Sequence, residues 1–118
     1  MEYTLKCGEV TATVRNLGGE LISYVKNGKE YCWTGDEKYW FRRSPALFPF
    51  VGGLVDGKVM IEGKECNMPD KHGFLRDSEL ELLEISDTKA VFELRENEKT
   101  LANYPYKFSF KMLSLIHI

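Results

Sequence analysis

The sequence predicts an all-β fold. Short segments along its whole length alternate apolar and polar residues with a period of two, which is the pattern of strands buried on one face. Turn-forming residues, chiefly glycine beside a polar residue, separate these segments. Only residues 36–41 and 96–103 have the composition of short helical turns, and no internal repeat or linker is visible.

The first third of the chain is predicted to be a β-meander. Gly8-Glu9 forms a tight turn, Leu17-Gly18-Gly19 interrupts the chain, and Asn27-Gly28 is a strong two-residue hairpin signal. The strands expected around these turns cover residues 3–6, 10–15, 21–25 and 31–33.

The rest of the chain continues in the same way. Glu62-Gly63 is expected to close one hairpin, and Ser86-Asp87-Thr88 another. Alternate residues of the last strand are apolar and lie on one face of it. We expect strands beyond this chain to be needed to cover this face. That face consists of Tyr106, Phe108, Phe110 and Met112. The strands expected here cover residues 59–61, 66–68, 80–85, 90–94 and 106–112.

Composition limits the function classes. The chain has 118 residues, of which 43% are hydrophobic and 29% charged, enough for one small core. A net charge of −2 leaves no basic surface for nucleic acid. With neither a leader nor a long apolar run, neither secretion nor a membrane span is indicated, and we expect a cytoplasmic protein. Cys7, Cys32 and Cys66 lack metal-ligand spacing and are interpreted as buried thiols in a reducing compartment.

The most informative segment is residues 42–77. His72 lies in a turn marked by Gly73, and residues 44–50 form an apolar, proline-punctuated ledge that cannot be the interior of a helix. Such a ledge is suited to form one wall of a cleft. Taken alone, His72 is more simply a structural turn histidine than a functional one.

Several separate blocks in this segment resemble one family in both order and spacing. The blocks are Ser44-Pro45-Ala46-Leu47-Phe48-Pro49, Val51-Gly52, Gly63-Lys64 with Met68, and His72-Gly73-Phe74 with Arg76-Asp77. They are similar to the aldose 1-epimerases, or galactose mutarotase-like proteins, in the bacterial subgroup with SPxLFPxVG and HGFxRD segments. The resemblance runs to Met112 and implies the N-terminal portion of a truncated galactose mutarotase-like β-sandwich (supersandwich), whose full domain is over twice this length.

The resemblance implies an isomerase that interconverts the α and β anomers of a hexose or related sugar, with no metal and no cofactor. This reaction needs a base for the C1 hydroxyl proton and an acid for the ring oxygen. His72 matches the first motif histidine of the family, which positions the substrate near the reacting centre. The family's acid histidine and glutamate base lie beyond the end of this chain, so the fragment itself is expected to be inactive.

The sugar contacts implied by the resemblance are Arg43, His72 and Arg76. Arg42 and Arg43 are adjacent on an extended segment and point to opposite faces, so at most one faces the sugar. Gly53 stands where many relatives carry a sugar-binding arginine. This departure leaves a second hypothesis open, a non-catalytic carbohydrate-binding relative of the mutarotases.

Two of three further side-chain groups keep two interpretations each. Arg76 and Asp77 form either an exposed ion pair or a contact that orders the His72 turn. The aromatic residues Trp33, Trp40 and Phe41 belong either to the core, which is the commoner case, or to a platform on which a sugar ring stacks. The acidic residues Glu79, Glu81 and Glu84 are interpreted as a solvated strand face rather than a metal site.

The last six residues, Leu-Ser-Leu-Ile-His-Ile, are what CTG TCT CTT ATA CAC ATC encodes, a string that resembles a transposase adapter used for sequencing libraries. We therefore divide the chain into a partial family domain, residues 1–112, and an adapter-derived tail, residues 113–118. On this interpretation His117 has no function. The alternative is a natural β-rich terminus.

Overall fold

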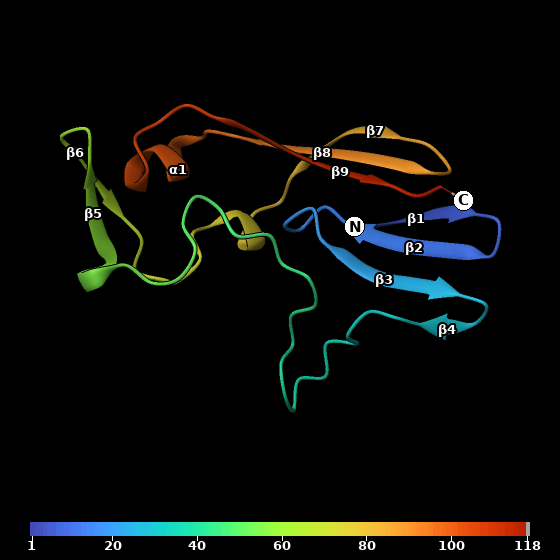
Figure 1. Ribbon diagram of the computed structural model, residues 1–118. Coiled ribbons are helices and arrows are strands. Elements are labelled where there is room, and N and C mark those ends of the chain that lie inside the picture. Colours follow the sequence, from blue (N-terminus) through green and yellow to red (C-terminus); the bar gives the residue numbers. More distant parts are fainter. Residues whose placement is uncertain (118) are drawn as a thin grey trace.

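The computed structural model describes residues 1–117, and the strands in this range form three antiparallel sheets (Figure 1). Besides two 3₁₀ turns (Val55–Gly57 and Leu75–Asp77), this range holds one α-helix, α1 (Glu98–Asn103). It lies in the segment predicted to hold a helical turn and is capped by Asn97, whose side chain accepts the Thr100 N–H. The all-β prediction is confirmed. Residues 36–41 form only a hydrogen-bonded turn, in which the Asp36 carbonyl accepts the N–H groups of Tyr39 and Trp40.

The first sheet is the predicted meander. Its strands pair in the order β1-β2-β3-β4, and Asn27 and Gly28 both have positive φ (51° and 75°), as a two-residue hairpin with this twist requires. The strands are β1 (Glu2–Cys7), β2 (Val10–Arg15), β3 (Leu21–Lys26) and β4 (Lys29–Glu30).

The strand predicted over residues 31–33 is wrong, because β4 ends at Glu30. The Glu30 carboxylate accepts the backbone N–H groups of Tyr24 and Cys32, each at 2.8 Å, and the hydroxyl of Ser23. The carboxylate thereby occupies the Tyr24 N–H of β3, which would donate to a backbone carbonyl if β4 were longer. These hydrogen bonds, that of Ser23 first, lower the pKa of Glu30 to about 2.

The remaining strands form a separate hairpin and a three-stranded sheet in the order β7-β8-β9. Glu62 and Gly63 make the predicted hairpin turn with φ of 49° and 77°. The last strand begins later than predicted, so Tyr106 and Phe108 precede it. The strands are β5 (Lys58–Ile61), β6 (Lys64–Asn67), β7 (Glu81–Ile85), β8 (Lys89–Arg95) and β9 (Ser109–Leu115).

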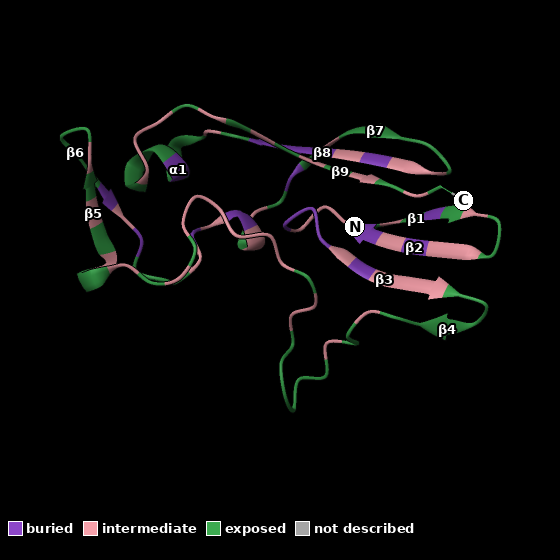
Figure 2. Ribbon diagram, in the orientation of Figure 1, coloured by how far each residue is buried: buried purple, intermediate pink, exposed green. Residues whose placement is uncertain are grey.

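The core lies between the first and the third sheet, where buried stretches of β1, β2 and β8 face each other (Figure 2). The ring centroids of Tyr3 and Phe92 are 5.7 Å apart across this interface. Phe108, Phe110 and Met112 pack against the same cluster but are only partly buried, so the need for further strands to cover their face stays a prediction. The buried cluster contains Leu5, Ala12, Val14, Leu75, Leu80, Ala90, Phe92 and Leu94.

The β9 strand continues past Met112, with Leu113 opposite Val91 and Leu115 opposite Lys89. The Ile116 N–H then donates to the Thr88 carbonyl at 2.9 Å. Hydrogen bonds between paired strands join backbone groups only, so most residue types can form them whatever their side chains. The adapter origin of residues 113–118 therefore stays a proposal, and residue 118 lies outside the described residues.

The cysteines differ in burial. Cys66 is fully buried, as predicted, and burial raises the pKa of its thiol. Cys7 and Cys32 are only half-buried, so the prediction of three buried thiols is wrong for these two. All three thiols are free.

Candidate functional site

The His72 turn is joined to the Val51-Gly52 block by two hydrogen bonds. The His72 N–H donates to the Gly52 carbonyl, and the Gly52 N–H donates to Nδ1 of the His72 imidazole, each at 2.9 Å. His72 has a φ of 71°, which is rare for a residue with a side chain and marks a turn held by its surroundings. The half-buried imidazole is thus held by the backbone N–H of Gly52, and the backbone of His72 by the Gly52 carbonyl.

The ledge and the turn form one unit through Phe48 and Gly73. The Phe48 carbonyl accepts the N–H groups of Phe74 at 2.9 Å and Leu75 at 3.2 Å. A Cβ atom at Gly73 would lie 2.1 Å from that carbonyl oxygen, so only glycine fits at this close approach. Leu75 is fully buried and anchors the turn in the core.

The surroundings of His72 favour its neutral form. Burial of the ring lowers its pKa, and the positive charges of Arg76 and Lys71 act in the same direction. A neutral imidazole carries one N–H and one acceptor nitrogen. At neutral pH this side chain is therefore suited to donate a hydrogen bond rather than to carry a charge.

Arg76 is held against the same turn. Its side chain is 13% exposed, and Nη2 donates to the Lys71 carbonyl at 3.1 Å. Nε is buried and has no hydrogen-bond partner within the described residues, since Asp77 Oδ2 is 3.7 Å away. Of the two interpretations of Arg76 and Asp77, this geometry favours a contact that orders the turn.

The adjacent arginines contact different elements, as their alternation predicts. Arg42 Nη2 donates to Asp77 Oδ1 at 2.8 Å, which ties it to the His72 turn. Arg43 Nη1 donates to the Ile22 carbonyl of β3 at 2.9 Å. The structure therefore joins Arg42, rather than the predicted Arg43, to the segment that carries His72 and Arg76.

Glu20 is a residue that the sequence analysis missed. It is 4% exposed, forms an ion pair with Arg15, and accepts the backbone N–H groups of Arg43 at 3.1 Å and Ser44 at 2.8 Å. Its carboxylate thereby fixes the start of the ledge against the first sheet. The sequence carries no signal for this role, because a charged residue after Gly18-Gly19 is typical of an exposed turn.

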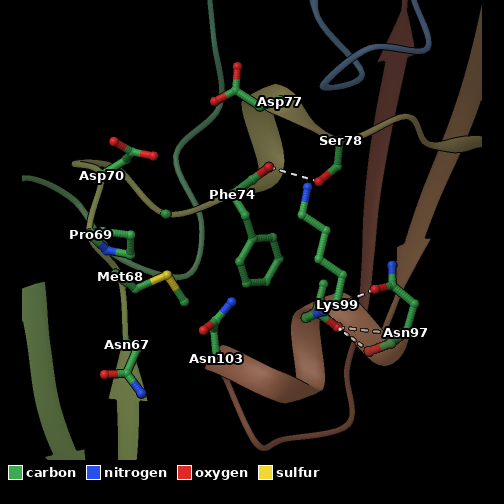
Figure 3. A pocket seen from close by; sticks show the side chains of 12 residues that line it. Asn67, Met68, Pro69, Asp70, Phe74, Asp77, Ser78, Asn97, Lys99 and Asn103 are labelled. Carbon is green, nitrogen blue, oxygen red and sulfur yellow. Dashed lines mark hydrogen bonds between the residues drawn. The ribbon is translucent and has the colours of Figure 1, made fainter.

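A cavity of about 250 Å³ lies beside the turn, between residues 67–78 and α1 (Figure 3). The ring of Phe74 lines the cavity, with Met68 on one side and the amide of Asn103 below (Figure 3). His72 does not line this cavity. The cavity and the imidazole are thus separate features of one turn.

The aromatic residues of the loop after β4 are exposed. The exposed fractions of Trp33, Trp40 and Phe41 are 42%, 49% and 62%, so the core interpretation is wrong for all three. The loop leaves the sheet at Glu30. Besides the turn at Asp36, it is closed by the Trp33 indole N–H, which donates to the Trp40 carbonyl at 2.7 Å. The sugar-platform interpretation stays a prediction.

Gly53 is exposed and leaves open space. A Cβ atom built on it would have one neighbour within 4 Å, the Cβ atom of Lys71 at 3.9 Å. A larger residue therefore fits sterically, and glycine here removes a side chain from the edge of the His72 turn.

Residues 1–117 offer neither a metal site nor a membrane-spanning helix. This range holds no group of three His, Cys, Asp or Glu side chains arranged to hold a metal ion. Glu79, Glu81 and Glu84 are exposed, as predicted. No helix in the same range is both long and apolar enough to cross a membrane.

Comparison with known proteins gives consistent matches over nearly the whole chain. The family described as aldose 1-epimerase matches residues 1–114. Protein LacX (plasmid) of Lactococcus lactis subsp. lactis is 32% identical over 96% of this chain, and its chromosomal counterpart is 31% identical. This chain spans 40% of the length of each.

Two solved structures have the same fold as this chain. A galactose mutarotase related enzyme from Lactobacillus acidophilus is 28% identical with a TM-score of 0.93, and the match covers 99% of this chain and 39% of that one. A galactose mutarotase-like protein from Lactobacillus casei is also 28% identical, with a TM-score of 0.94 over 99% of this chain and 40% of that one. The fold predicted from the sequence is confirmed.

Proposed function

Because the chain belongs to the aldose 1-epimerase family, we propose that the protein formed by these residues and the rest of the family domain interconverts the α and β anomers of a hexose or related sugar. The family match over residues 1–114 is the observation that carries this proposal. The fixed, neutral His72 beside Arg76 supports it, because hydrogen-bond donors suit the oxygen-rich surface of a sugar.

In this proposal His72 positions the substrate by donating a hydrogen bond to a sugar oxygen. Arg76 contributes its remaining donors, and one arginine of the ledge supplies a further contact. Arg43 is the residue predicted from the sequence, and Arg42 competes with it because Arg42 is tied to Asp77. The acid and base would come from the part of the family domain beyond this chain.

The proposed reaction consists of two proton transfers and leaves the oxidation state of the sugar unchanged. It needs neither an electron carrier nor a group carrier, so we propose an isomerase that works without a cofactor on a small sugar in the cytoplasm. Neither nucleic acid nor a membrane has a part in this chemistry.

The test is polarimetry of glucose and galactose mutarotation with the full-length protein, in wild-type and His72→Ala forms. We expect His72→Ala to lower kcat by about 10²-fold, which corresponds to about 2.7 kcal/mol of transition-state stabilisation. Residues 1–118 alone should not accelerate the reaction above buffer. A saturable acceleration by residues 1–118 would show that the catalytic groups have been misplaced.

The gene itself offers a second test. The genomic DNA beyond the codon for Met112 should differ from the adapter string and should encode a second histidine and a later glutamate. Genomic codons that match Leu-Ser-Leu-Ile-His-Ile would identify residues 113–118 as natural instead.

A carbohydrate-binding relative without turnover is the second candidate, and Gly53 is the observation that favours it. The exposed glycine provides no hydrogen bond from a side chain at the edge of the turn. In that case His72→Ala would weaken sugar affinity, measured by calorimetry, while wild type showed no mutarotation. Unchanged affinity and unchanged turnover would remove His72 from the site.

A further inference from the structure

The hydrogen bond between Gly52 and His72 carries information about the ring proton. The backbone N–H of Gly52 can only donate, so Nδ1 of His72, 2.9 Å away, must present its lone pair. In the neutral ring the single proton must then lie on Nε2. The second bond of the pair, from the His72 N–H to the Gly52 carbonyl, fixes the ring's backbone against the same residue.

The charged groups around the ring act in the same direction. Protonating Nδ1 would set one N–H against another and break the bond to Gly52. Arg76 and Lys71 are the charged groups that act on the imidazole, and both oppose a positive charge on it. Nε2 has no hydrogen-bond partner within the described part of the chain, so its proton is free for an acceptor outside it.

We propose that the backbone N–H of Gly52 is a positioning group that holds His72 in the Nε2–H tautomer, so that His72 acts as a neutral hydrogen-bond donor. The inference rests on the proposed function only for the identity of the acceptor, a sugar oxygen. Neither nitrogen of His72 then has a free lone pair, so His72 does not take the C1 hydroxyl proton, and the base lies elsewhere.

The geometry at Gly52 explains why a glycine stands there. Its φ is 83°, in the region that favours glycine, and a Cβ atom would have no neighbour within 4 Å. Glycine is therefore favoured here by the positive φ that directs the N–H toward Nδ1, and not by steric crowding at the Cβ position.

The first test is NMR of the chain labelled with ¹⁵N in the histidine rings, in which one-bond and two-bond couplings report where the proton lies. His117 is the internal reference, and a His72→Gln variant assigns the signals. We expect His72 to favour the Nε2–H form by about tenfold, which corresponds to about 1.4 kcal/mol, within the range of a single hydrogen bond. A His72 that carries the proton on Nδ1, or has the same mixture as His117, would overturn the proposal.

The second test removes the donor without adding bulk. Residues 1–65 can be made by chemical synthesis with an ester oxygen in place of the Gly52 N–H. This piece is then joined to the rest of the chain by ligation at Cys66. The Gly53 ester is the matched control, because the Gly53 N–H makes no hydrogen bond within residues 1–117. We expect only the Gly52 ester to reduce the tautomer preference, by about tenfold, and to raise the pKa of His72. Equal behaviour of the two esters would contradict the role of Gly52.

Both readouts are made without sugar. Failure of the proposed function would appear as a full-length protein without mutarotation, and the tautomer of His72 would be unaffected by it. Failure of the present inference would appear in the ring spectrum, whatever the polarimeter records.

Discussion

The two packed sheets and the segment of residues 42–77 are held together in different ways. The sheets share a buried apolar cluster and continuous strand pairing, so their stability is spread over many contacts. The site segment adds Leu75 to that cluster, but its His72 turn and ledge are positioned by a few individual groups, namely the Phe48 carbonyl, the Gly52 amide and the Glu20 carboxylate. The stability lost on substitution in the sheets should therefore increase with the side-chain volume removed. In the site segment the loss should depend on single atoms that make or block one contact.

The largest expected effect is in the sheets. Phe92 is fully buried, and Phe92→Ala should lower the free energy of unfolding by about 3–5 kcal/mol, because the cavity it leaves collapses only in part. Leu113→Ala on the adjacent strand is the control. Leu113 is 55% exposed, and its removal should change the stability by only about 0.5 kcal/mol. Urea unfolding measures both, and equal losses would show that the sheets do not share the core described.

The sheets are also the part that the sequence predicts well. Alternation along β2 and β8 and the dipeptides Asn27-Gly28 and Glu62-Gly63 are local signals, and the structure follows them. The error over residues 31–33 arose because a side chain, the Glu30 carboxylate, replaces a backbone partner. The alternation of apolar and polar residues in the sequence does not show that a side chain takes the place of a backbone partner.

The site was predictable only in part. The residues that identify the family lie in sequence blocks, so His72 and Arg76 could be predicted as site residues from the sequence, and their contacts with a sugar stay a prediction. The contacts that fix them join residues far apart in the sequence, as the bond from Gly52 to His72 and the pair of Arg42 with Asp77 show. Buried Glu20 was missed for the same reason, since its partners are Arg15 and the distant ledge.

The next largest effect tests a single atom of the site segment. A Cβ atom at Gly73, where φ is 70°, would collide with the Phe48 carbonyl, so Gly73→Ala should cost about 3 kcal/mol from strain and overpacking together. Gly63→Ala is the matched control, since φ is 77° there but no atom lies within 4 Å, and it should cost about 1 kcal/mol. Thermal unfolding compares the two. Equal losses would place the cost in the backbone angle and not in the contact with Phe48.

A buried and an exposed carboxylate sharpen the same comparison. Glu20→Gln replaces an acceptor that serves Arg15 and two backbone N–H groups, and we expect a loss of about 2 kcal/mol. Glu84→Gln removes the surface partner of Lys89, 2.8 Å away and 53% exposed, and should cost at most about 0.5 kcal/mol. Urea unfolding of both variants at neutral pH decides the matter. A Glu20→Gln protein as stable as wild type would show that the ledge is not held by this carboxylate.

The smallest expected effect is the pH dependence due to His72. Burial, Arg76 and Lys71 lower its pKa in the folded protein, whereas in the unfolded chain the pKa is about 6.5. As the pH falls below that value, the unfolded chain binds a proton before the folded protein does, so stability decreases and then levels off below the folded pKa. Unfolding midpoints at pH 7.5 and pH 5.5, compared between wild type and His72→Gln, isolate this contribution, and His117→Gln should behave like wild type. A wild-type midpoint that rises on acidification relative to His72→Gln would mean that the folded site favours the charged ring, which the Gly52 N–H at Nδ1 and the two flanking cations should prevent.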